Sequence, residues 1–135
     1  MDLNLYFDPV DFAHFEGGAG FSRHTLGHAI RKETLKLKGW SKGDIKVALM
    51  GVPVETGTTD RGCSGAPAAI REQLYRLANL ATLRGIIDLG DLKPGKSPQD
   101  RYFALRDVTE YLADSGVTAV VIGGGQDLSV GISRA

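Results

Sequence analysis

Carboxylate and amide side chains lie near the ends of two apolar runs that are expected to form buried strands. Residues 120–129 read VVIGGGQDLS, so apolar residues and three glycines are followed by Gln126 and Asp127. Asp88 and Asp91 end a second apolar run, GIIDLGD. In open α/β sheets, ligands gather at the carboxyl ends of the strands. The pattern therefore predicts a site that carries carboxylates at one edge of a sheet.

A third strand end continues into the loop GVPVETGTTDRGCSGAP, residues 51–67, just before a predicted helix. Backbone N–H groups at such a position can bind phosphate. However, the loop lacks the Gly-Lys-Ser/Thr ending of a P-loop, and neither it nor GGGQDL has the G-x-G-x-x-G spacing. An anion- or nucleotide-binding module therefore stays as a weakly supported alternative.

Each of these features also has a purely structural interpretation. The glycines can serve tight turns and close helix–strand packing. Asp88 and Asp91 can accept backbone N–H groups from a neighbouring loop. Cys63 is expected to be an unreactive small side chain. His24 and His28, four residues apart, could share a metal ion, but no third ligand is evident.

Composition indicates one globular domain in a reducing compartment. The chain has 135 residues, 42% hydrophobic and 24% charged, with sixteen basic and sixteen acidic residues. Nothing in that balance favours nucleic acid or an anionic membrane as a partner. A single cysteine excludes an intramolecular disulfide, and we expect neither a signal peptide nor a membrane-spanning segment. We therefore expect a cytoplasmic protein.

Three short apolar runs, residues 45–52, 85–91 and 117–125, predict buried strands separated by two amphipathic helices. The alternation predicts parallel strands with right-handed crossovers and helices over the sheet, a three-layer α/β fold. The first helix, within 67–83, begins near Pro67 and is expected to bury Ile70, Leu74, Leu77 and Ala81.

The second helix, within residues 97–116, has Ser97 as N-cap and Asp100 completing the cap. Its predicted apolar stripe is Leu105, Val108 and Leu112, and Gly116 is expected to end it. Residues 1–44 are predicted to form an N-terminal extension with a further helix within 22–40. That helix would bury Leu26, Ile30 and Leu37, and Gly39 would end it.

Three motifs resemble, in chain order, the first half of the ureohydrolase family of arginases, agmatinases and formiminoglutamases. They are GVPVETGTTDRGCSGAPAAIREQLYRL, DLGD and VVIGGGQDLS, and the match covers about residues 47–130. The G-G-G form resembles the formiminoglutamase branch. The resemblance implies an arginase-like α/β domain with the local strand order second–first–third. It also implies two Mn²⁺ ions at the carboxyl edge, whose bridging hydroxide attacks a guanidinium or amidine carbon.

The resemblance implies roles for particular positions. Asp88 and Asp91 would brace a strand end, and Gly123, Gly124 and Gly125 would lie at the metal edge. The substrate-entrance loop would contain Thr58, Asp60, Arg61, Gly62, Cys63 and Ser64. Gln126 stands where the family has a histidine ligand, and an amide oxygen is a weaker ligand than imidazole. Asp127 could replace it by a one-residue shift, because a carboxylate suits Mn²⁺.

The family's later carboxylate and histidine ligands have no counterpart after Asp127. We therefore expect residues 1–135 to be the N-terminal portion of one arginase-like domain: an extension, 1–44, and a core, 45–135. Alone, this portion is expected to be inactive and metal-free and to associate with itself or with the missing C-terminal half. The full protein would be a hydrolase of linear amidines, or alternatively a metal-free family member serving in binding or assembly.

Overall fold

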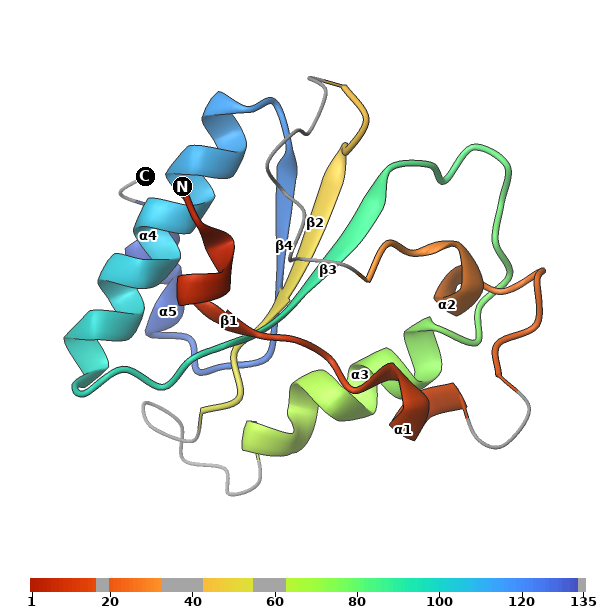
Figure 1. The fold of residues 1–135 in the computed structure, drawn as a ribbon. Helices are drawn as coiled ribbons and strands as arrows, with labels where there is room; N and C mark the ends of the chain where they lie inside the picture. The colour runs from red at the N-terminus through yellow and green to blue at the C-terminus, as the bar shows by residue number, and fades with distance from the viewer. Residues whose placement is uncertain (17–19, 33–42, 55–62, 134–135) are drawn as a thin grey trace.

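The structure, a computed structural model, describes residues 1–16, 20–32, 43–54 and 63–133 (Figure 1). In chain order its elements are η1 (Leu3–Leu5), β1 (Phe7–Asp8), α1 (Phe12–Glu16), α2 (Leu26–Ala29), β2 (Val47–Gly51), η3 (Cys63–Gly65), α3 (Ala66–Leu74), β3 (Ile86–Leu92), α4 (Pro98–Asp114), β4 (Thr118–Ile122) and α5 (Leu128–Ile132). In this part of the chain, no helix is both long enough and apolar enough to cross a membrane.

The four strands form one sheet in the order β1-β3-β2-β4. β2 runs parallel to both of its neighbours, with Ala48 opposite Ile87 on one side and Ala119 on the other. This pairing confirms the predicted parallel core with its first strand in the middle. β1, which the sequence did not predict, pairs antiparallel with β3 at Phe7 and joins the N-terminal extension to the sheet.

Helices cover both faces of the sheet, as a three-layer fold requires (Figure 1). On one face, Ala48 and Met50 pack in a core with Leu105 and Val108 of α4. On the other face, Leu49 packs in a second cluster that includes Tyr75, directly after α3. Alternate residues of β2 therefore serve opposite cores, which explains its continuous apolar sequence.

The helix α4 begins and ends as its sequence predicts. Ser97 Oγ accepts from the backbone N–H of Asp100 at 3.3 Å, and the Asp100 carboxylate accepts from the Ser97 N–H at 2.8 Å. The hydrogen bond from Ser97 is the main reason that the pKa of Asp100 is lowered. Gly116, with φ of 73°, follows the helix, and the predicted stripe of Leu105, Val108 and Leu112 is buried.

The predicted helix within 22–40 is much shorter than expected over its described part. Leu26 and Ile30 are buried as expected, but α2 ends at Ala29 and Ile30 has an extended backbone. Arg31 then forms a parallel bridge with Ile87, so its backbone extends the sheet instead of a helix. Pairing with the exposed edge of β3 therefore overrides the helical pattern. The remainder of this prediction, including Leu37 and Gly39, lies outside the described residues.

The predicted stripe of the first crossover helix is wrong except at Leu74, which packs against the second cluster. α3 ends at Leu74, and Ile70 and Leu77 are 45% and 58% exposed. The buried positions are instead Pro67, Arg71 and Tyr75, each four residues from the next. On this face Arg71 meets carboxylates of β3, and Tyr75 reaches Asp88 with its hydroxyl while its ring packs in the second cluster.

Candidate functional site

The Arg71 side chain of α3 hydrogen-bonds to both aspartates of β3 that the sequence singled out, Asp88 and Asp91. Its Nε and Nη2 donate to the two Asp88 carboxylate oxygens, each at 2.9 Å, a bidentate pair. Nη1 donates to Asp91 Oδ1 at 2.5 Å, and Nη2 also donates to the Gly90 carbonyl at 3.0 Å. The Arg71 and Asp88 side chains are 1% and 0% exposed. The single guanidinium therefore pairs with two carboxylates on one strand.

Asp88 is saturated by further donors. Its Oδ1 accepts from the backbone N–H of Gly90 at 2.9 Å, and its Oδ2 accepts from the Tyr75 hydroxyl at 2.5 Å. The pKa of Tyr75 is raised mainly by burial, and further by the charge of Asp88 and the hydrogen bond to it. Burial alone would lower the pKa of Arg71. The hydrogen bonds and charges of Asp88 and Asp91 outweigh this effect, so the pKa of Arg71 is raised. At neutral pH Arg71 therefore stays protonated and Tyr75 keeps its hydroxyl proton.

Gly51, the last residue of β2, leaves the space that this ion-pair cluster occupies. A Cβ there would lie 2.0 Å from Asp91 Oδ1 and 2.9 Å from Arg71 Nη1. No real Cβ makes so short a contact, so a larger residue would displace the carboxylate. The glycine that ends β2 is thus required by the chemistry at the end of β3.

The loop after β4 brings the third strand end to the same edge. Gly123 and Gly124 have φ of 81° and 80°, a region that residues with a side chain avoid. A Cβ on Gly123 would lie 2.9 Å from the Pro67 ring, and one on Gly124 would lie 3.5 Å from Val52 Cβ. The loop after β4 therefore packs against the start of α3 and the end of β2.

Asp127 ends this loop and precedes α5. Tyr102 of α4 donates its hydroxyl hydrogen bond to Asp127 Oδ2, and this bond is the main cause of the raised pKa of Tyr102. The other carboxylate oxygen, Oδ1, is buried and has no hydrogen-bond partner in the described part of the chain. Gln126 is exposed, and its backbone carbonyl accepts from Ser129 Oγ at 2.6 Å.

The structure thus places the predicted residues at one edge, with different surroundings. Cys63 and Ser64 lie in η3, immediately before α3. Gly125 lies between the two positive-φ glycines and Gln126, and its carbonyl accepts from the Leu128 N–H at 3.2 Å. The other predicted loop residues, Thr58, Asp60, Arg61 and Gly62, lie outside the described residues.

The residues present do not by themselves fit a two-metal centre. A two-metal site needs several carboxylate and imidazole ligands around ions about 3.5–4 Å apart. Within residues 1–16, 20–32, 43–54 and 63–133, no three His, Cys, Asp or Glu side chains are placed to hold an ion. His24 and His28 accordingly have no third ligand there. Among the described residues at this edge, Asp127 Oδ1 is a buried carboxylate oxygen without a donor, which suits a cation.

Three residues of the site were missed from sequence: Arg71, Tyr75 and Tyr102. Two aspartates in an otherwise apolar strand were the available signal for the first, since buried carboxylates need a positively charged or donating partner. Arg71 and Tyr75 lie four apart on one helix face, which is consistent with a shared partner. No comparable signal links Tyr102 to a carboxylate 25 residues later.

Comparison with known proteins agrees with this geometry. The model of the arginase family matches residues 45–135, so the chain belongs to the arginase family. It is 29% identical to the non-hepatic arginase 2 of Xenopus laevis, covering 81% of this chain and 34% of that protein. The crystal structure of Trypanosoma cruzi formiminoglutamase with Mn²⁺ superposes with a TM-score of 0.61 at 27% identity, covering 67% and 35% of the two chains. The chain thus spans about a third of the length of these relatives.

Proposed function

We propose that this chain forms the first part of a ureohydrolase that cleaves a C–N bond of a guanidinium or formimino group. The observation that carries the proposal is the convergence of three strand ends at one sheet edge, where Asp127 keeps one buried carboxylate oxygen without a partner. Membership of the arginase family supports the reaction class. The arginase-like core would be residues 45–135, preceded by the extension of residues 1–44.

Within the family, a formiminoglutamase-like substrate is our first choice over arginine or agmatine. The triple glycine of residues 123–125 supports it, as does the structural similarity to the Trypanosoma cruzi formiminoglutamase. That enzyme was solved with Mn²⁺, and we propose two Mn²⁺ ions for a full-length protein of this type. Residues 1–135 alone are proposed to bind no metal and to be inactive, because one carboxylate oxygen cannot hold two metal ions.

A metal-free family member that serves in binding or assembly is the second candidate. Gln126 is the observation that favours it, because a neutral amide replaces imidazole at the position where the family has a ligand. Its backbone position, held by the Ser129 hydrogen bonds, is compatible with either side chain. A test must therefore separate the effect of residue 126 from that of the surrounding fold.

A chimera provides that test. The third of Trypanosoma cruzi formiminoglutamase that this chain matches is replaced by this chain, with Gln126 retained or changed by Gln126→His. The hydrolase proposal expects Mn²⁺-dependent turnover of N-formimino-L-glutamate with Gln126 retained. The non-catalytic alternative expects turnover only after Gln126→His. A chimera that unfolds cooperatively but is inactive in both forms would contradict the hydrolase proposal.

We propose a cytoplasmic location, because the single cysteine is consistent with a reducing compartment.

We also propose that β4 pairs with another strand. β4 lies at the edge of the described sheet, and Val120 on it is 39% exposed. Exposed apolar edges tend to pair with other strands. Later strands of the same protein would occupy this edge where present, and a second copy where they are absent. Sedimentation velocity across a wide concentration range tests this; a strict monomer throughout would contradict it.

A further inference from the structure

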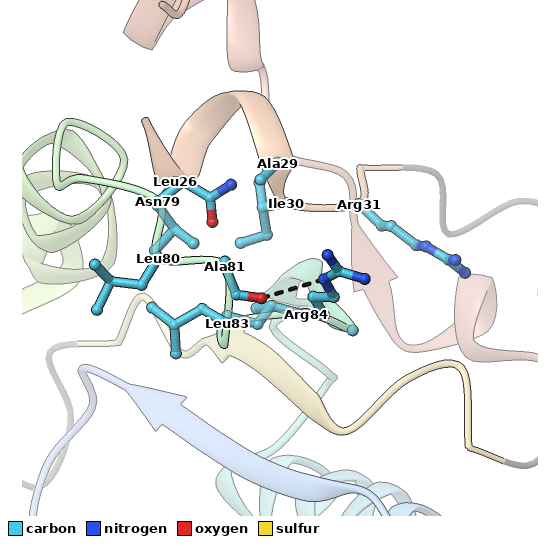
Figure 2. Close-up of a pocket in the computed structure, with 11 residues that line it drawn as sticks. Leu26, Ala29, Ile30, Arg31, Asn79, Leu80, Ala81, Leu83 and Arg84 are labelled. Carbon is cyan, nitrogen blue, oxygen red and sulfur yellow. Dashed lines mark hydrogen bonds between the residues drawn. The ribbon is translucent and has the colours of Figure 1, made fainter. Parts of the chain in front are cut away.

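Two buried side-chain oxygens have no hydrogen-bond partner among the described residues, and they lie at opposite ends of the sheet. Asn79 is one of the residues around a cavity of about 320 Å³, where α2 meets the start of β3 (Figure 2). Asp127 lies in the loop after β4, at the carboxyl edge that holds the candidate site. The surroundings of Asp127 therefore bear on the proposed function, whereas those of Asn79 do not.

The side chain of Asp127 is held by α4. The Tyr102 hydroxyl of that helix donates to Asp127 Oδ2, although the two residues are 25 positions apart in sequence. Helix α5, which begins directly after Asp127, packs against α4 (Figure 1). Leu128, its first residue, is buried in the core that α4 covers. The end of the loop is therefore fixed to a helix on one face of the sheet.

Residue 126 lies between neighbours whose backbone is fixed. The Gly125 carbonyl accepts from the Leu128 N–H at 3.2 Å. The Gln126 carbonyl accepts from the Ser129 N–H at 3.2 Å and from Ser129 Oγ at 2.6 Å. A Cβ on Gly124 would lie 2.0 Å from Leu128 Cδ1, so the loop packs tightly on the first turn of α5. Gln126 itself is exposed. The loop thus holds residue 126 by its backbone and leaves its side chain uncovered by the described residues.

We propose that Tyr102 is a positioning residue, which acts through Asp127 to set the place of residue 126 at the sheet edge. The backbone hydrogen bonds around residue 126 stay within residues 125–129, whereas the Tyr102 bond joins this segment to another helix. The inference rests on the proposed function, in which residue 126 occupies a metal-ligand position of the family. Removing a group that holds a metal ligand in place typically weakens metal affinity by roughly 10–100-fold.

Two tyrosines of α4 supply a matched pair of variants. Tyr102 and Tyr111 are both partly buried, and both pack against the same core. Tyr102→Phe removes the hydroxyl that binds Asp127, whereas Tyr111→Phe removes a hydroxyl that takes no part in that bond. A second pair separates geometry from charge. Asp127→Asn keeps an oxygen that accepts from Tyr102, and Asp127→Ala removes it.

The first measurement is ¹⁵N relaxation of the 135-residue chain, which reports the order of each backbone N–H. We expect order parameters near the rigid value of about 0.85 at Gln126 and Asp127 in the unmodified chain. They should fall in Tyr102→Phe and in Asp127→Ala, and stay unchanged in Tyr111→Phe and in Asp127→Asn.

The second measurement is calorimetric titration of Mn²⁺ into the formiminoglutamase chimera that carries Gln126→His. Adding Tyr102→Phe should weaken Mn²⁺ binding roughly tenfold, and adding Tyr111→Phe should leave it unchanged. Asp127→Asn should retain the affinity and Asp127→Ala should lose it, because the hydrogen bond to Tyr102 rather than the charge of Asp127 is required.

Three results would overturn the proposal. They are unchanged order parameters in Tyr102→Phe, equal effects of the two tyrosine variants, or a loss of Mn²⁺ affinity in Asp127→Asn as large as in Asp127→Ala, which would make Asp127 itself a ligand. A chimera that binds no Mn²⁺ even with Gln126→His would contradict the proposed function instead. The relaxation measurement requires neither metal nor turnover, so it would still decide whether Tyr102 positions residue 126.

Discussion

The carboxyl ends of β3 and β4 carry aspartates in opposite states. At the end of β3, Asp88 is fully buried, and Arg71, Tyr75 and the Gly90 N–H together satisfy both its oxygens. At the end of β4, Asp127 receives one hydrogen bond, from Tyr102, and its second oxygen has no partner in the described structure. Both oxygens of Asp88 therefore have hydrogen-bond donors, whereas one oxygen of Asp127 has none in the described structure.

This difference separates structural from functional carboxylates. A buried charge is tolerated only when paired, and Asp88 has no remaining oxygen with which to bind a ligand. Asp127 keeps an acceptor at the edge where parallel sheets bind ligands. We infer that the end of β3 holds the sheet edge in place, while any chemistry depends on the loop after β4.

The largest expected effect is at Arg71. Arg71→Met keeps much of the side-chain volume but leaves Asp88 buried without its cation, which should lower the free energy of unfolding by about 3–5 kcal/mol. Urea denaturation followed by far-ultraviolet circular dichroism measures this loss. The matched control is Arg76→Met, because the Arg76–Glu72 pair is 62% and 51% exposed. It should change stability by less than about 1 kcal/mol. Similar losses in both variants would contradict the distinction.

Tyr75 is predicted to give the second-largest effect, visible mainly at high pH. Its pKa is raised in the folded protein, so it stabilises the fold fully below the unfolded value of about 10. That contribution is lost as pH rises above about 10, at roughly 1.4 kcal/mol per pH unit until the folded pKa is reached. Tyr75→Phe should lose about 1 kcal/mol at neutral pH and show a shallower alkaline decline. Urea midpoints between pH 7 and 11 test this; parallel declines would contradict it.

Local signals in the sequence were sufficient for three of the four strands of the described sheet and for α4. Apolar β-branched runs marked β2, β3 and β4, and Ser97 with Asp100 marked the start of α4. Such features depend on residues close together in sequence, so a pattern can identify them. The parallel direction of the strands followed from the two helical crossovers. Their order was implied by the resemblance to the ureohydrolases.

Features that depend on distant partners were missed. Arginines on helices are usually exposed, so an apolar stripe through Ile70 was the expected choice over Arg71. The truncation of α2 has the same origin: the backbone of Arg31 pairs with Ile87, 56 residues later. The glycine loop follows β4 in the structure, but nothing in its sequence indicated that Tyr102 would donate a hydrogen bond to Asp127.

A smaller effect is expected at the β4 end. Tyr102→Phe removes one hydrogen bond to a partly exposed carboxylate, so the unfolding free energy should fall by much less than in Arg71→Met. Asp127→Asn keeps the size and an acceptor oxygen, and should cost less still. Urea denaturation of both variants beside Arg71→Met completes the comparison. A loss at Tyr102 as large as that at Arg71 would mean that Asp127 is also structural.

The smallest expected effect concerns Mn²⁺. At the candidate edge Asp127 keeps one buried carboxylate oxygen without a partner, and the described residues form no group of three ligands. Calorimetric titration of Mn²⁺ into the 135-residue chain should therefore show no binding at micromolar concentration, and Gln126→His should not create tight binding alone, because two ligands are too few. In the chimera with formiminoglutamase, where further ligands are present, the same substitution should raise Mn²⁺ affinity by roughly tenfold or more. Tight stoichiometric binding by the unmodified chain would show that the β4 end already holds a complete metal site, and the contrast between the two strand ends would then be one of metal ligation rather than of hydrogen bonding.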